Sequence, residues 1–172
     1  MQILFRNIGE LLQVEGGPPA KLKIRRSCAL LVRHGRVEKV LRDSRIKSSS
    51  YNKVVDMGGR TVSPGFVDCH THLIHAGDRK DEMLDRLNGK SYLEILKSGG
   101  GILNTVAATR KASEKSLFQT ARQRMRRMMA LGTTAFEIKS GYGLDLETEL
   151  KMLRVGKRLR EDLKVPVTLT YL

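Results

Sequence analysis

The stretch Ser63-Pro64-Gly65-Phe66-Val67-Asp68-Cys69-His70-Thr71-His72 decides the fold of this 172-residue chain. Its first three residues are typical of a turn, and residues 66–72 are predicted to form a β-strand. From Thr61 onward, segments with strand-like and helix-like patterns alternate, as they do in parallel α/β proteins. The chain is therefore divided into a β portion, residues 1–62, and an α/β portion, residues 63–172.

Two histidines of this strand are candidate metal ligands. Side chains alternate along a strand, so His70 and His72 project from the same face at its C-terminal end, with Cα atoms about 7 Å apart. Active sites of parallel α/β barrels gather at this end, and imidazole suits zinc or iron. A catalytic site needs at least a third protein ligand. His34, in a turn, and His75, beyond the strand, are poor candidates for it.

The segments after the strand extend the α/β pattern. A short helix is predicted over residues 81–88, and Ser91 with Glu94 forms a capping box that opens another. Strands are predicted over Thr133–Lys139 and from Val165, separated by a helix that Asp145 caps and that carries several leucines. Between them, a long helix from Ser113 places apolar side chains at helical spacing: Leu117, Phe118, Ala121, Met125, Met128 and Met129.

The arginines of this long helix, Arg122, Arg124 and Arg127, fall on or beside its other face. A solvated basic face is favoured over an RNA-binding or membrane-surface helix, because apolar stripes at this spacing are ordinary core faces.

The first sixty residues are predicted to form β-strands. Cys28–Arg33 and Arg36–Leu41 flank the turn His34-Gly35 and indicate a hairpin. A polar stretch, Asp43–Asn52, follows it. So few strands are not stable alone and need a larger body on which to pack.

Composition narrows the classes of protein. The 32 Lys and Arg residues outnumber the 18 Asp and Glu residues, which gives a net charge of +14. The basic residues are spread along the chain without an RNA-binding signature or any Trp, so no nucleic-acid partner is expected. No apolar stretch approaches the roughly 18 residues of a membrane span. Two cysteines without a CxxC spacing favour a cytoplasmic protein.

Residues 63–72 resemble the metal motif of the amidohydrolase superfamily. Later segments make the chain similar to the imidazolonepropionase family, the hydrolases of histidine degradation. The resemblance is dense from about Thr61 to Leu172 and loose before it. It is carried by residues 76–79 (AGDR), 89–92 (GKSY), 99–102 (GGGI) and 137–153 (EIKSGYGLDLETELKML).

The resemblance implies a partial TIM (β/α)₈ barrel, its first strands only, preceded by a small β-sandwich portion. It also implies hydrolysis of 4-imidazolone-5-propanoate to N-formimidoyl-L-glutamate with one zinc or iron ion. His70 and His72 would be metal ligands, Arg79 and Tyr142 would contact this small-molecule substrate, and Tyr92 would help to hold its propionate. No membrane partner is expected, and a homodimer of the complete protein is considered.

The family's other metal ligands, catalytic Glu and substrate-contacting His have no counterpart before Leu172, so no catalytic acid or base is assigned within the chain. Because the family has one metal, Lys139 is not assigned as a ligand, and Glu137 on the same strand face could neutralise it. Three parallel strands cannot close a barrel of eight. We therefore expect the coding sequence to continue past Leu172.

Two other interpretations remain open. One is another cyclic-amide hydrolase of the same superfamily, of the hydantoinase or dihydropyrimidinase type, in which a carboxylated lysine bridges two metals. The other is a non-catalytic basic fragment that binds nucleic acid through its arginine-rich helices.

Overall fold

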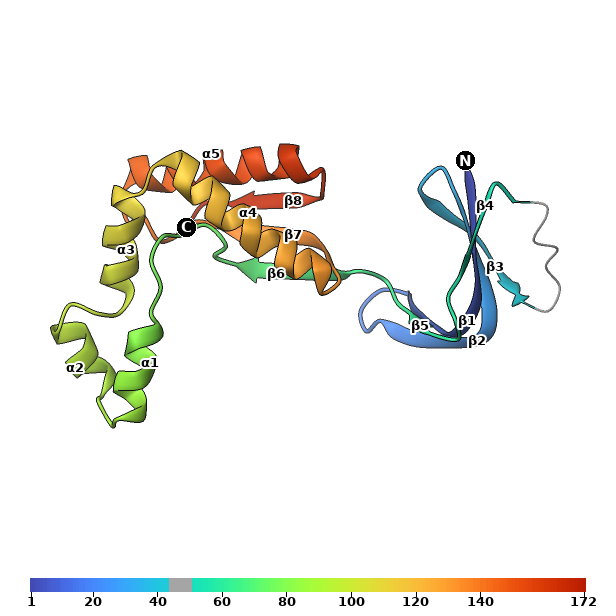
Figure 1. Ribbon diagram of the computed structural model, residues 1–172, viewed down its shortest axis with the longest axis horizontal. Helices are drawn as coiled ribbons and strands as arrows, with labels where there is room; N and C mark the ends of the chain where they lie inside the picture. The colour runs from blue at the N-terminus through green and yellow to red at the C-terminus, as the bar shows by residue number, and fades with distance from the viewer. Residues whose placement is uncertain (44–50) are drawn as a thin grey trace. The chain divides into compact units, whose positions relative to one another are not determined.

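The computed structural model describes residues 1–43 and 51–172 (Figure 1). They form two compact units, Met1–Pro64 and Gly65–Leu172. Most of the polar stretch expected between Asp43 and Asn52 lies outside the described residues.

The first unit is one mixed β-sheet. It contains β1 (Gln2–Glu15), β2 (Lys21–Arg33), β3 (Arg36–Arg42), β4 (Lys53–Asp56) and β5 (Thr61–Val62). The strand order is β3-β2-β1-β4, and β5 also pairs with β1. The long β1 pairs with β2 along most of its length, while its first part pairs with β4 and its later part with β5.

The predicted hairpin is confirmed as β2 and β3. Arg33 pairs with Arg36, and the two residues between them, His34 and Gly35, have φ angles of 51° and 75°. Positive φ at both central residues is typical of the type I′ turn that joins two twisted strands. The sheet buries a small cluster formed by Ile8, Leu11 and Cys28.

The second unit contains three parallel strands and five helices among the described residues. In chain order these are β6 (Phe66–Thr71), α1 (Lys80–Leu87), α2 (Tyr92–Lys97), α3 (Ile102–Lys111), α4 (Glu114–Ala130), β7 (Thr133–Lys139), α5 (Leu146–Leu163) and β8 (Val167–Thr170). The strands lie in the order β6-β7-β8. A β portion followed by parallel strands that alternate with helices is thus confirmed.

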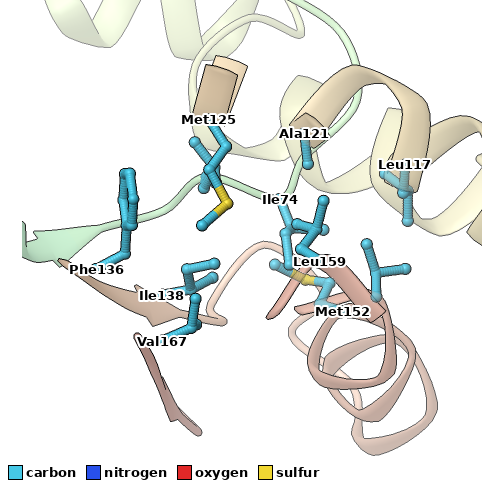
Figure 2. Close-up of a cluster of buried hydrophobic side chains, with 11 residues drawn as sticks. Ile74, Leu117, Ala121, Met125, Phe136, Ile138, Met152, Leu159 and Val167 are labelled. Carbon is cyan, nitrogen blue, oxygen red and sulfur yellow. The ribbon is translucent and has the colours of Figure 1, made fainter. Parts of the chain in front are cut away.

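Helices α4 and α5 bury their apolar faces against one face of this sheet. Leu117 and Met125 of α4 and Leu159 of α5 pack in one cluster with Phe136 and Ile138 of β7 (Figure 2). Because side chains alternate along a strand, the intervening Glu137 and Lys139 lie on the opposite face of β7, where both are only partly buried. The sheet therefore has an apolar face toward the helices and a polar face away from them.

Some helix predictions were incomplete. Helix α3 was not predicted, because glycines precede it and no side chain caps its N-terminus at Gly101. Of the leucines expected on α5, Leu159 is buried together with Met152 and Val155, whereas Leu146 and Leu150 are exposed.

Removal of the Met125 side chain should destabilise the α/β unit. Met125 is 0% exposed, and truncation of such a side chain to alanine costs about 2 to 5 kcal/mol. We expect Met125→Ala to lower the free energy of unfolding by this amount in urea denaturation. The control is Met83→Ala on α1, where the side chain is 66% exposed and the change should stay within about 0.5 kcal/mol. Equal losses in both variants would contradict the assigned core.

Candidate functional site at the C-terminal ends of β6 and β7

Three aromatic rings meet where β6 and β7 end. His70 lies in β6 and His72 lies one residue beyond it. Their ring centroids are 5.4 Å apart. The ring of Tyr142, from the loop after β7, meets the ring of His72 edge-on with the centroids 5.3 Å apart. The structure therefore brings together three of the five residues that the sequence placed in the site.

Lys139 and Glu137 form an ion pair on the polar face of β7. Lys139 Nζ donates a hydrogen bond to Glu137 Oε1 at 2.5 Å, and Thr170 Oγ1 on β8 donates to the same oxygen at 2.8 Å. Hydrogen bonds from Lys139, then from Thr170, hold the pKa of Glu137 below its usual range. The Lys139 ammonium is therefore already neutralised by a carboxylate.

The loop after β6 is held from two helices. Arg124 of α4 donates through Nη1 to the carbonyl oxygens of Leu73, at 3.0 Å, and of His75, at 2.8 Å. The backbone N–H of Ala76 donates to Thr109 Oγ1 of α3 at 3.1 Å. Arg124 was expected on or beside a solvated basic face, and this was wrong: burial in the unit lowers its pKa, and its donors satisfy two loop carbonyls.

His75 lines the same site without joining the metal pair. Its ring meets Tyr142 edge-on with the centroids 5.5 Å apart. Burial, followed by the charge of Arg124, lowers the pKa of His75. The imidazole is therefore neutral at pH 7, and it packs against the same tyrosine that contacts His72.

Arg79 is anchored by a carboxylate that the sequence did not reveal. Arg79 Nε donates to Glu82 Oε2 at 2.7 Å, and the N–H of Gly101 donates to Glu82 Oε1 at 2.6 Å. This contact uses Nε, so it does not occupy the Nη groups, with which a guanidinium can bind a second carboxylate. Glu82 lies in the first turn of α1. Acidic residues are common there because they interact favourably with the helix dipole, so the sequence gave no sign that Glu82 binds Arg79.

Tyr92 belongs to the same neighbourhood. It is the first residue of α2, and the Arg86 guanidinium lies 5.8 Å from its ring centroid. The hydrogen bond from Arg79 to Glu82 raises the pKa of Arg79, with smaller contributions from the charge of Glu82 and from Tyr142 and Tyr92. Both tyrosines expected to contact the substrate therefore lie within electrostatic range of Arg79.

The donor set for a metal is partial. Across residues 1–43 and 51–172, no three His, Cys, Asp or Glu side chains gather closely enough to hold an ion. His72 Nδ1 is buried and, among the described residues, has no hydrogen-bond partner. Two adjacent imidazoles fit the chemistry of zinc or iron but leave the ligand set short.

Across residues 1–43 and 51–172, no helix is long and apolar enough to cross a membrane.

Solved structures share this fold at low sequence identity. A triazine hydrolase variant aligns with 99% of this chain and 35% of its own, with a TM-score of 0.66 and 15% identity. Guanine deaminase from E. coli aligns with 98% of this chain and 35% of its own, with a TM-score of 0.60 and 15% identity. The fold is that of the N-terminal portion of TIM-barrel enzymes.

Sequence comparison narrows this class. Imidazolonepropionase from Pseudomonas entomophila is 44% identical over 172 residues, all of this chain and 42% of the relative. That from Hahella chejuensis is 49% identical over 146 residues, 85% of this chain and 36% of the relative. No family model matches. The chain is homologous to the imidazolonepropionases and spans about two-fifths of their length or less.

Arg124 should stabilise the loop after β6. Arg124→Met removes the donors of two loop carbonyls, and leaving such groups unsatisfied costs about 1 to 3 kcal/mol each. We expect a loss of at least about 1 kcal/mol in the free energy of unfolding, measured by urea denaturation. Arg126→Met, two residues away on the exposed side of α4, is the matched control. A loss no larger than that of the control would show that the two hydrogen bonds are not needed.

Proposed function

We propose that this chain is part of an imidazolonepropionase, which hydrolyses the ring amide of 4-imidazolone-5-propanoate to N-formimidoyl-L-glutamate. The observation that carries the proposal is the 44% identity to an imidazolonepropionase over all 172 residues, an alignment that spans the positions of all the site residues. The activity belongs to a chain of the relatives' full length, because the residues described here supply only part of a site.

His70 and His72 are proposed as two ligands of one zinc or iron ion. Their adjacent rings and the chemistry of imidazole support this assignment, and a solved structure with the same fold, atrazine chlorohydrolase TrzN from Arthrobacter aurescens, was obtained with zinc. When bound, the ion would lower the pKa of a bound water to about 7 and polarise the ring carbonyl. The remaining ligands would come from chain segments beyond residue 172.

Arg79, Tyr92 and Tyr142 are proposed to bind the substrate. Arg79 would hold the propionate carboxylate through its Nη groups while Glu82 fixes Nε. Tyr92 would flank that carboxylate, and Tyr142 would contact the substrate next to His72. With its carboxylate held at Arg79, the substrate would present its ring amide to the histidines. This orientation would lower the entropic part of the activation free energy of hydrolysis.

Two other functions have less support. In a hydantoinase or dihydropyrimidinase type of enzyme, a carboxylated lysine on a strand bridges two metals, whereas here Lys139 Nζ is paired with Glu137. Nucleic-acid binding through the basic helices is opposed by the ion pairs of those helices. Arg122 is paired with Asp162 and Arg154 with Glu114, so these charges are not free for phosphates.

A cytoplasmic location and a homodimer of the complete protein are also proposed. Support for the location comes from Cys28 and Cys69, which are both free thiols. Cys28 is buried and Cys69 is exposed on β6, so an oxidising compartment would leave Cys69 open to oxidation.

The two histidines should be required for the metal. In the full-length enzyme, meaning residues 1–172 joined to the remaining barrel segments, we expect His70→Ala or His72→Ala to remove most of the bound metal together with activity, because either change leaves the ligand set short. Metal content is measured by elemental analysis of the purified protein. The control is His34→Asn in the β2–β3 turn, where Asn tolerates the positive φ. Full metal content in both alanine variants would exclude the ligand assignment.

Arg79 should act on the carboxylate of the substrate. In the full-length enzyme, Arg79→Met removes a charge-assisted contact that contributes about 1.5 to 3 kcal/mol. We expect kcat/KM to fall on the order of 10- to 100-fold, with unchanged metal content, in steady-state kinetics.

An analogue without the carboxylate should be hydrolysed almost equally by the wild type and by Arg79→Met, since neither enzyme can use the contact. Lys80→Met, at the neighbouring exposed position, should change neither reaction. Equal damage to both substrates by Arg79→Met would make Arg79 a structural residue.

A further inference from the structure

A buried carboxylate lies next to the loop that carries Tyr142. Glu149, in the first half of α5, is 2% exposed, whereas Glu147 on the same helix is exposed. A carboxylate taken out of water is costly unless hydrogen-bond donors compensate it. The partners of Glu149 therefore indicate what the group does.

The donors to Glu149 are backbone N–H groups of the loop on both sides of Tyr142. The N–H of Gly141 donates to Oε2 at 2.6 Å. The N–H groups of Gly143 and Leu144 donate to Oε1 at 2.6 Å and 2.8 Å. Distances this short are typical of hydrogen bonds to an ionised acceptor. Both oxygens of one side chain are thus used to hold one loop.

The carboxylate is ionised in this environment. Burial raises the pKa of Glu149, but hydrogen bonds from the Ser140 hydroxyl and from the loop N–H groups outweigh it, and the pKa lies below its usual range. The acceptor is therefore negatively charged at neutral pH.

The loop leaves little space for another arrangement. A Cβ at Gly143 would lie 2.8 Å from the backbone nitrogen of Glu149 and 3.0 Å from its Oε1. Gly141 has a φ of 119°, which strains any residue with a side chain. Arg110 Nε donates to the carbonyl oxygen of Gly143 at 2.7 Å from the other side. The backbone that flanks Tyr142 is held at its N–H and at its C=O groups.

The hydrogen bonds to Glu149 determine where the ring of Tyr142 lies. With its backbone fixed on both sides, the Tyr142 ring meets the rings of His72 and His75 edge-on. Loss of the Glu149 contacts would release the loop at both glycines at once. The ring would then lose its defined place beside His72.

We propose that Glu149 is a positioning residue. By accepting hydrogen bonds from the segment of residues 141–144, it holds Tyr142 in the place where this tyrosine contacts the substrate. This inference rests on the proposed function and deepens it. Glu149 itself does not touch the substrate. A glutamine cannot replace it, because its amide NH₂ would face at least one N–H donor of the loop.

The test uses the full-length, metal-loaded enzyme with 4-imidazolone-5-propanoate as substrate. We expect Glu149→Gln to lower kcat/KM on the order of 10- to 100-fold and to leave metal content unchanged. Glu147→Gln, the exposed neighbour on the same helix, should match the wild type. If Glu149→Gln retains full kcat/KM or loses its metal, the proposal is overturned.

A double-mutant cycle separates positioning from a general structural role. If Glu149 acts through Tyr142, then Glu149→Gln should cost less than about threefold in a Tyr142→Phe background. An equal, additive loss in both backgrounds would overturn the proposal. If Glu149→Gln does not fold, Glu149→Asp keeps the charge but withdraws it by one methylene, and it must show the same dependence on Tyr142.

Hydrogen exchange provides a readout that does not need the reaction. The amides of Gly141, Gly143 and Leu144 should exchange faster in Glu149→Gln than in Glu147→Gln, because glutamine lacks the charge and one of the two acceptor oxygens that these amides share. If the wild type does not hydrolyse the substrate but exchange still rises in this segment, the proposed function fails while the clamp stands. Unchanged exchange would exclude the clamp whatever the activity.

Discussion

The alternation of side chains along β7 is the constraint on which the α/β unit depends. Phe136 and Ile138 point into the core with α4 and α5, so Glu137 and Lys139 are forced onto the other face. A shift of one residue in the pairing with β8 would exchange the two sets and bury an ion pair among methionines and leucines. On β6, His70 lies close enough to Glu137 to contribute to the lowered pKa of that carboxyl, after the hydrogen bonds from Lys139 and Thr170. The apolar core and the polar site are thus two results of one register.

Beyond the strand ends, long polar side chains order the loops. Arg124 reaches from α4 to two carbonyls of the loop after β6, and Glu149 reaches from α5 to three N–H groups of the loop after β7. Lys151 similarly donates to three carbonyls at the C-terminal end of α3, including that of Ala112. The loop after β6 also buries Leu73 and Ile74 in the apolar core, so there the hydrogen bonds from Arg124 add to hydrophobic burial rather than replace it.

The sequence predicted what depends on local pattern. The strand Thr133–Lys139, the capping box at Ser91 and the hairpin turn at His34-Gly35 follow from alternation, capping and turn chemistry, and each is found as expected. Glu149, Glu82 and Arg124 could not be found in this way. In the sequence, each of them resembles an ordinary charged residue on the solvent-exposed face of a helix. Its role becomes visible only in the folded chain, where its side chain hydrogen-bonds to the backbone of a loop. Helical spacing alone also does not say which leucines of α5 are covered, and of those on this helix Leu159 is buried whereas Leu146 and Leu150 are exposed.

The contact between Glu82, Arg79 and Gly101 has a thermodynamic consequence. One carboxylate serves two partners, a guanidinium and the backbone of the Gly99–Gly101 turn. An anion bound at the Nη groups would share the guanidinium charge with Glu82 and so change how strongly Glu82 holds that turn, and by linkage the state of the turn would change the affinity of Arg79 for the anion. Glycines lose more backbone freedom on ordering than other residues. Part of the affinity of Arg79 for such an anion would therefore be set by the entropy of three glycines that do not touch it.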